Sequence, residues 1–163
     1  MTAHLTAARR SPAEQRKLEA AFTELFERLV TFNQVLGLKV LSVGPTGPQL
    51  RFDMRPELVG HYQHGRLHGG VISATLDAMA GLAIMVGLGE KHPEEPAEQV
   101  MHRFNRLGTI DLRIDYLRPG IGRHFTASAE VVRLGGRVGS VQMRLENDDG
   151  LLVATGAASY ILS

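Results

Sequence analysis

The sequence predicts an α+β domain in which an antiparallel sheet wraps around one long apolar helix, with an additional helix at the N-terminus. Three observations support this prediction. Residues 71–88 form a nearly continuous apolar run of helical length, in which Asp77 is the single charged residue. A helix that is apolar nearly all round must be surrounded by other elements. The segments after it alternate between apolar and polar residues across short turns, as antiparallel hairpins do, and 163 residues suffice for one such domain.

The N-terminal part of the chain predicts a helix that packs on the core. Ser11-Pro12-Ala13-Glu14 matches a capping box with proline at the first helical position, so the helix should begin here. Apolar side chains then recur at helical spacing, namely Leu18, Phe22, Leu25, Phe26 and Leu29. Gly37 is expected to end the helical region. Residues 1–10 are expected to be disordered, and residues 11–163 to form a single domain.

Most of the remaining segments are expected to be strands joined by tight turns. Residues 38–56 predict two strands around the turn at 44–48. Residues 109–116 alternate strictly, which places Ile110, Leu112, Ile114 and Tyr116 on one face and Thr109, Asp111, Arg113 and Asp115 on the other. Two strands are expected around the Gly135-Gly136 turn and a last one after residues 147–150. Residues 90–108 are a polar insertion, expected at the surface with a short helix starting at Pro96.

Composition and charge exclude several classes of function. The chain has 18 Lys and Arg against 17 Asp and Glu, no tryptophan and 6% aromatic residues, so we expect no nucleic-acid partner. The absence of cysteine excludes disulfides and thiolate chemistry and fits a reducing, cytoplasmic compartment. The N-terminus lacks the apolar stretch of a secretory signal. Asp77 argues against a membrane span, because a charge at the bilayer centre costs about 2.5–3.5 kcal/mol.

The start of the apolar helix has the features of an anion or oxyanion site. Gly69 and Gly70 are expected in its first turn, where backbone N–H groups lack intrahelical partners. Asp77 follows Gly69 by eight residues, which is about 12 Å of helical rise and too far for both to act on one carbonyl. A second copy of the helix, antiparallel across a two-fold axis, would bring the partner's Asp77 beside this glycine pair. We therefore expect a homodimer with a shared site.

Structural explanations for the same residues remain open at this stage. Asp77 is as well explained by a buried ion pair or a backbone cap, and the glycine pair by close helix–sheet packing. His68 is suited to capping the helix. His61, His64 and His68 have helical spacing that suggests metal ligands, but the glycines between them make a poor helix and no acid completes the set. We expect no metal, and neither a nucleophile elbow nor a nucleotide-binding glycine motif occurs.

Four segments together resemble the hot-dog-fold acyl-CoA thioesterases of the PaaI-type, 4-hydroxybenzoyl-CoA thioesterase superfamily. They are GRLHGGVISATLDAMAG, TIDLRIDYLRPG, VVRLGGRV and NDDGLLVATGAASYI, and the similarity runs from about Gly37 to the C-terminus. The resemblance implies a sheet wrapped around a long helix and thioester hydrolysis at a dimer interface without metal or cofactor. It also implies that the Gly69 N–H, after His68, binds the thioester carbonyl, that Asp77 is the base or nucleophile, and that Thr109 assists.

The resemblance further implies where coenzyme A lies, and it includes one departure. The asparagine of the family pattern falls on Tyr62, and Gln63 or His61 supplies a polar contact only after a one-residue shift. Gly70, Tyr62 and Gln63 are expected to contact the substrate. The residues implied to bind its coenzyme A part are Tyr116, Arg118, Pro119, Arg133, Gly135, Gly136 and Arg137. The three arginines are candidates for its phosphates, although each is also explained as a solvated charge at a strand end.

The function that these expectations define is hydrolysis of acyl-CoA thioesters to free acid and CoA. The many aliphatic residues and few aromatic ones favour an aliphatic acyl group of medium to long chain. Self-association as a homodimer, or as a dimer of dimers, is expected. Two alternatives remain: a non-catalytic acyl-CoA binding module, and an acyl-thioester hydratase or dehydratase that uses His68 with Asp77.

Overall fold

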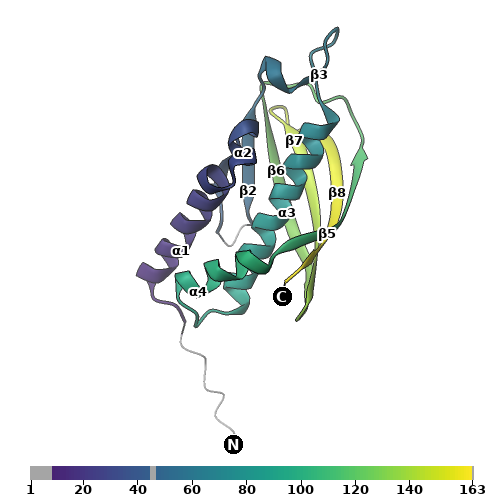
Figure 1. The fold of residues 1–163 in the computed structure, drawn as a ribbon. Coiled ribbons are helices and arrows are strands. Elements are labelled where there is room, and N and C mark those ends of the chain that lie inside the picture. Colours follow the sequence, from purple (N-terminus) through teal and green to yellow (C-terminus); the bar gives the residue numbers. More distant parts are fainter. Residues whose placement is uncertain (1–8, 45–46, 163) are drawn as a thin grey trace, which may run out of the picture.

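The computed structural model describes residues 9–44 and 47–162, in which a curved sheet packs against helices (Figure 1). The helices are α1 (Pro12–Glu24), the π-helical η1 (Leu25–Leu29), α2 (Thr31–Leu36), the 3₁₀ turn η2 (Pro56–Leu58), α3 (Gly69–Lys91), α4 (Ala97–His102) and the 3₁₀ turn η3 (Arg103–Arg106). The strands are β1 (Lys39–Ser42), β2 (Gln49–Asp53), β3 (Val59–His61), β4 (Arg66–Leu67), β5 (Gly108–Tyr116), β6 (His124–Leu134), β7 (Val138–Asn147) and β8 (Leu152–Ile161).

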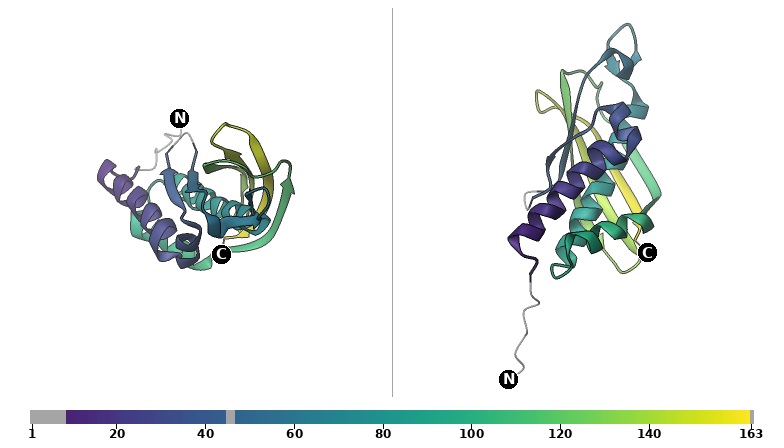
Figure 2. Two further views of the ribbon diagram at one scale, coloured as in Figure 1. Left: turned by 90° about the horizontal axis from the view of Figure 1, so that it is seen from above. Right: turned by 60° about the vertical axis from the view of Figure 1, so that its left-hand side comes forward.

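The main sheet is antiparallel and wraps around α3. Its six strands lie in the order β1-β2-β6-β7-β8-β5, while β3 and β4 form a separate small hairpin. The view from above shows the sheet curving around α3, with α1 lying outside the wrapped helix (Figure 2). This arrangement confirms the α+β prediction of an antiparallel sheet around a central helix with an extra N-terminal helix.

The central helix α3 is the core of the domain. Leu76, Met79, Leu82, Ile84 and Met85 are each fully buried. By length and composition α3 is long and apolar enough to cross a membrane, but 67% of its most apolar 18-residue stretch is buried inside the fold. Burial within the sheet therefore accounts for the apolar run, as expected from the sequence.

The N-terminal helical layer departs from the prediction at one point. Ser11 Oγ accepts the N–H of Glu14 at 3.2 Å, so the helix begins where the capping motif placed it, and Gly37 ends the layer with a φ of 72°. The helix is interrupted, however, by the π-helical η1. The wider turn shifts the helical phase, so Leu29 is 64% exposed instead of continuing the buried stripe.

The polar insertion is packed and is not a loose surface segment. The expected short helix is present as α4, and Val100 is fully buried within it. α1 and α4 lie against each other, and Glu14 Oε2 accepts the N–H of Ala97 at 3.0 Å. The expected surface placement of residues 90–108 is therefore wrong for the side of α4 that carries Val100, which faces the core.

Arg10 ties the start of the chain to the same region. Its guanidinium donates to the backbone oxygens of Gly89 at 2.6 Å and His92 at 3.2 Å. The expected disorder of residues 1–10 thus does not extend to Arg10. Residues 1–8 lie outside the described part of the chain.

An ion pair within the insertion leads to a stability prediction. Glu95 is 8% exposed, and Arg103 donates to both of its carboxylate oxygens, with Nε at 3.0 Å from Oε2. The Arg103 hydrogen bond holds the pKa of Glu95 below its ordinary value of 4.5. Arg103→Leu is expected to lower the free energy of unfolding in urea by about 1.5–3 kcal/mol at pH 7. The neighbouring exposed Arg106→Leu is the control, with little change expected.

The stability difference between wild type and Arg103→Leu should also depend on pH. A carboxyl whose pKa is lowered by folding stabilises the protein above its unfolded pKa, and this contribution is lost as the pH falls through the folded value. The difference in unfolding free energy should therefore be full at pH 6–7 and shrink below about pH 4.5. A difference that stays constant down to pH 3 would contradict this role of the pair.

Candidate active site

Asp77 lies in the third turn of α3, with two hydroxyl groups from the sheet on one of its carboxylate oxygens. Thr109, on β5, donates from Oγ1 to Asp77 Oδ1 at 2.9 Å. Tyr160, on β8, has its Oη 2.6 Å from the same carboxylate oxygen. In the described ranges 9–44 and 47–162, no Lys, Arg or His nitrogen lies within 4.0 Å of this carboxylate. The ion-pair interpretation of Asp77 thus finds no partner among the described residues.

A β-bulge places Thr109 beside Asp77. The β5–β8 register pairs Thr109 with Tyr160 and Asp111 with Ser159, so Ile110 is an extra residue between them. Strict alternation assigned Thr109 to the outer face and Ile110 to the inner face. That assignment is wrong at the bulge, because one inserted residue reverses the direction of the side chains that precede it. Thr109 consequently faces α3, and Ile110 is 56% exposed.

Tyr160 is a site residue that the sequence analysis missed. The side chain is 4% exposed, and burial, followed by the hydrogen bond to Asp77, raises the pKa of its phenol above the ordinary value of 10.0. Gly81 is one turn beyond Asp77 on α3, and the hydroxyl lies 3.8 Å from the position that a Cβ on Gly81 would take, which is an ordinary contact distance. A buried tyrosine hydroxyl needs a polar partner, and Asp77 is the one charged residue of the apolar run. That requirement was the available indication of a contact.

The N-terminus of α3 presents one backbone N–H without an acceptor. His68 is the N-cap, and its Nδ1 accepts the N–H of Gly70 at 2.8 Å. Among the described residues no group accepts the N–H of Gly69. The Tyr116 hydroxyl donates to the Gly69 carbonyl at 3.2 Å, and its ring lies 3.3 Å from the position of a Cβ on Gly69. Gly69, and not Gly70, therefore offers the free donor of the helix end.

Within one chain the two parts of the candidate site are separated along α3. The eight residues from Gly69 to Asp77 span about 12 Å at the rise of an α-helix. Three of the hollows in the described part of the structure have volumes of about 430–660 Å³, and Asp77 lines none of these three. One of them lies between α1 and the C-terminal half of α3, and another lies over the outer face of the sheet. None of these three hollows encloses the carboxylate and the helix end together.

The residues expected to bind the substrate, including its coenzyme A part, fall into two groups at opposite ends of α3. Near the N-terminal end, Tyr62 is 86% exposed on the β3–β4 turn beside Gln63, and Arg118 donates to the Leu152 carbonyl at 2.9 Å in the loop that continues to Pro119. That loop meets β4, where Leu67 donates to Gly120.

The second group lies on the β6–β7 turn and comprises Arg133, Gly135, Gly136 and Arg137. Lys91, at the end of α3, donates to the Gly135 carbonyl at 2.7 Å and so fixes this turn at the C-terminal end of the helix. The 23 residues of α3 span about 34 Å, so one chain does not bring the two groups to a single helix end.

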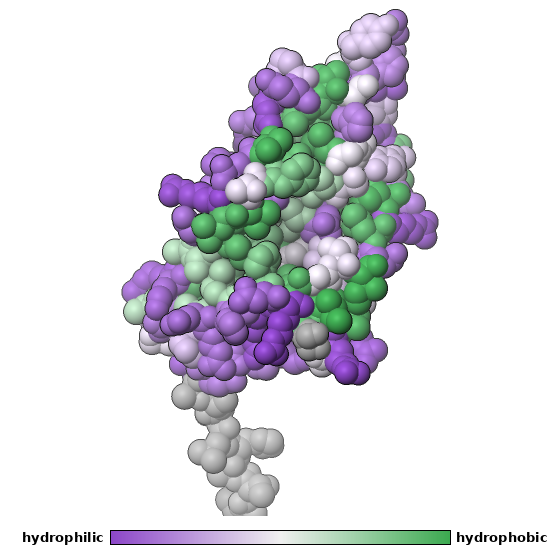
Figure 3. All heavy atoms as spheres, viewed as in Figure 1, coloured by the Kyte–Doolittle hydropathy of each residue, from purple (hydrophilic) through white to green (hydrophobic). Residues whose placement is uncertain are grey.

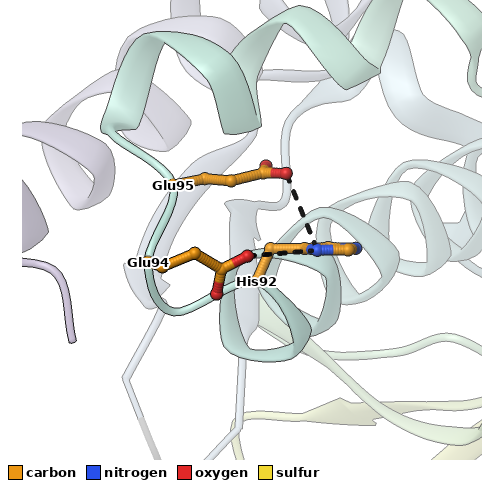
Figure 4. Close-up of side chains that lie close together, drawn as sticks. All are labelled: His92, Glu94 and Glu95. Atoms are coloured by element: carbon orange, nitrogen blue, oxygen red, sulfur yellow. Dashed lines mark ion pairs between the residues drawn. The ribbon is translucent and has the colours of Figure 1, made fainter. Parts of the chain in front are cut away.

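Two histidine-containing clusters bear on metal binding. The rings of His61 and His64 lie 4.7 Å apart, but His68 directs its Nδ1 to a backbone N–H instead of joining them. His92, Glu94 and Glu95 lie close together at the end of α3 (Figure 4). Both oxygens of Glu95 accept hydrogen bonds from Arg103, so the ion pair within the insertion explains this cluster without a metal.

Comparisons with known proteins identify the class. Residues 64–154 match the family model of the thioesterase superfamily, and this chain belongs to that family. The medium/long-chain acyl-CoA thioesterase YigI of Salmonella typhimurium is 38% identical over 139 residues, covering 85% of this chain and 90% of that protein. YigI of Escherichia coli is 37% identical over the same coverage.

Solved structures agree with this assignment. A Shewanella oneidensis protein related to the thioesterase superfamily matches with a TM-score of 0.86 and 35% identity over 94% of this chain and all of the other. The N33D variant of the phenylacetic acid degradation protein PaaI from Thermus thermophilus matches with a TM-score of 0.61 and 26% identity, over 82% of this chain and 99% of that one. The chain is thus a hot-dog-fold thioesterase, and the resemblance inferred from its motifs is confirmed.

Proposed function

We propose that this thioesterase hydrolyses medium- to long-chain aliphatic acyl-CoA, with Asp77 as base or nucleophile and the Gly69 N–H as donor to the thioester oxygen. The observation that carries the proposal is the Asp77 carboxylate, which is held by two hydroxyls and has no ion-pair partner among the described residues. The YigI relatives, named as medium/long-chain acyl-CoA thioesterases, support the substrate class.

The proposed reaction joins Asp77 of one subunit to the helix end of another. Asp77 takes a proton from water as the water oxygen attacks the thioester carbon, or the carboxylate attacks that carbon itself and water then hydrolyses the anhydride. The partner subunit's Gly69 N–H stabilises the negative charge that develops on the carbonyl oxygen. The C–S bond then breaks, and the CoA thiolate leaves and takes up a proton. Water, a carboxylate and a backbone donor suffice for these steps, so we propose no metal or other cofactor.

Surface features support a homodimer built on the face that carries the site. β5 is an edge strand of the sheet, with one side free to pair with another chain. Exposed apolar side chains adjoin Asp77 and Gly69, including Ile110 at 56% and Tyr116 at 55%. Figure 3 shows apolar surface across the face on which α2, α3 and β5 lie. We also propose that two dimers can associate, so that the two coenzyme-binding groups at one site come from different chains. The proposed location is the cytoplasm.

Thiol release from a panel of acyl-CoAs tests the proposed function. The full chain, in buffer with EDTA, is expected to hydrolyse straight-chain acyl-CoAs. Its kcat/KM should be highest for substrates with medium to long acyl chains. Crotonyl-CoA hydration is measured in parallel, because a hydratase would add water to the double bond and release no thiol. Binding of acyl-CoA without thiol release at any chain length would contradict the proposal.

A further inference from the structure

The two oxygens of the Asp77 carboxylate have different surroundings. Oδ1 accepts from Thr109 Oγ1 at 2.9 Å and lies 2.6 Å from Tyr160 Oη. Among the described residues no donor lies within hydrogen-bond distance of Oδ2. A carboxylate oxygen has about two lone-pair sites, so two hydroxyls occupy Oδ1 while Oδ2 remains open.

We propose that Tyr160 is a positioning residue for the thioester hydrolysis, which together with Thr109 anchors Oδ1 and so makes Oδ2 the oxygen that meets water or the thioester. The inference rests on the proposed function of Asp77. An aspartate side chain on a helix surface can rotate, and hydroxyls from two different strands fix its orientation. Tyr160 does not contact the substrate itself, because it is 4% exposed behind the carboxylate.

The surroundings of Tyr160 suit a permanent donor. The Asp77 carbonyl oxygen also lies 2.7 Å from the phenol oxygen, so the single phenol proton is shared between two acceptors of the same residue, and both keep the ring against this turn of α3. Burial raises the pKa of the phenol, so it keeps its proton across the neutral pH range. A hydroxyl that stays protonated continues to donate while the carboxylate is ionised, which is the state that hydrolysis requires.

Tyr160→Phe is the direct test because it removes the hydroxyl and keeps the ring. We expect kcat to fall about 10- to 100-fold, the range for losing a hydrogen bond to a charged group, with KM for acyl-CoA changed less than about twofold. Thr109→Val, which removes the other donor to Oδ1, should show the same division between kcat and KM. Ser159→Ala is the control, since it deletes a hydroxyl from the next residue of β8, on the opposite face of the sheet.

The split between kcat and KM, measured per folded molecule, separates positioning from a purely structural role. A purely structural role would lower the melting temperature and leave kcat per folded molecule unchanged, whereas a positioning role lowers kcat per folded molecule. Ser159→Ala should change neither kcat nor KM.

The outcomes distinguish this inference from the proposed function. A wild type that hydrolyses acyl-CoA, beside Tyr160→Phe and Thr109→Val variants with unchanged kcat per folded molecule, would overturn the positioning role alone. A wild type that releases no thiol would overturn both. Should Tyr160→Phe fail to fold, the kcat of Thr109→Val tests whether the hydroxyls on Oδ1 position the carboxylate. The double variant Asp77→Asn/Tyr160→Phe should be no slower than Asp77→Asn, because Tyr160 acts only through Asp77.

Discussion

Asp77→Asn is expected to lower kcat by about 10²- to 10⁴-fold while acyl-CoA binding is retained. The amide has the shape of the carboxylate, but it neither accepts a proton from water nor attacks a thioester. Its oxygen still accepts from Thr109 and Tyr160, so the local hydrogen bonds persist. No buried cation loses a partner among the described residues, so the melting temperature should change little. Thiol-release kinetics and thermal unfolding of the same preparation measure both quantities.

Asp111→Asn is the matched control for that substitution. It makes the same chemical change at an exposed position two residues from Thr109, on the outer face of β5. Its kcat should equal that of the wild type. An Asp77→Asn protein that melts early yet turns over normally would show that the acid is structural and would contradict its assignment as base or nucleophile.

Gly69→Pro is expected to lower kcat by about 10²- to 10³-fold, the loss that follows removal of one oxyanion donor. Gly69 is the first residue of α3, where proline is well tolerated because the N–H has no intrahelical partner. His68 has φ −67° and ψ 135°, which is the extended conformation that a residue before proline prefers. The substitution therefore removes the candidate donor while the helix start is preserved.

Gly69→Ala controls for the bulk that proline adds. Either side chain approaches the Tyr116 ring, which lies 3.3 Å from the Cβ position, but alanine keeps the N–H. The kcat of Gly69→Ala should therefore remain much closer to that of the wild type. Equal losses in the alanine and proline variants would show that crowding against Tyr116, and not the missing donor, explains the effect.

The architecture could be predicted from the sequence because it depends on patterns within single elements. The apolar run that became α3 is too apolar to lie on a surface, and the Ser11 capping motif marks the start of α1. The π-helical turn at residues 25–29 could not be predicted in the same way. The apolar residues there keep nearly helical spacing, so the sequence pattern does not indicate that Leu29 leaves the core.

The candidate site was predictable in part for a related reason. Gly69 and Asp77 stand in one continuous helix, so their spacing is fixed by the geometry of the helix alone. Only the family resemblance indicated Thr109, because its contact with Asp77 depends on a bulge that the alternation of residues 109–116 does not reveal. Tyr160 lies 83 residues after Asp77 in the chain, and only the position of β8 beside β5 brings it to the carboxylate.

The central claim is that each site combines Asp77 of one subunit with Gly69 of the other, and mixing two inactive variants tests it most directly. Asp77→Asn and Gly69→Pro chains are unfolded together, refolded at equal amounts and assayed beside each refolded alone. Random pairing makes half of the dimers mixed, and each mixed dimer has one complete site, so activity should recover to about a quarter of the wild-type value. A mixture no more active than its separate components would contradict the shared site, because it would place both groups within one chain.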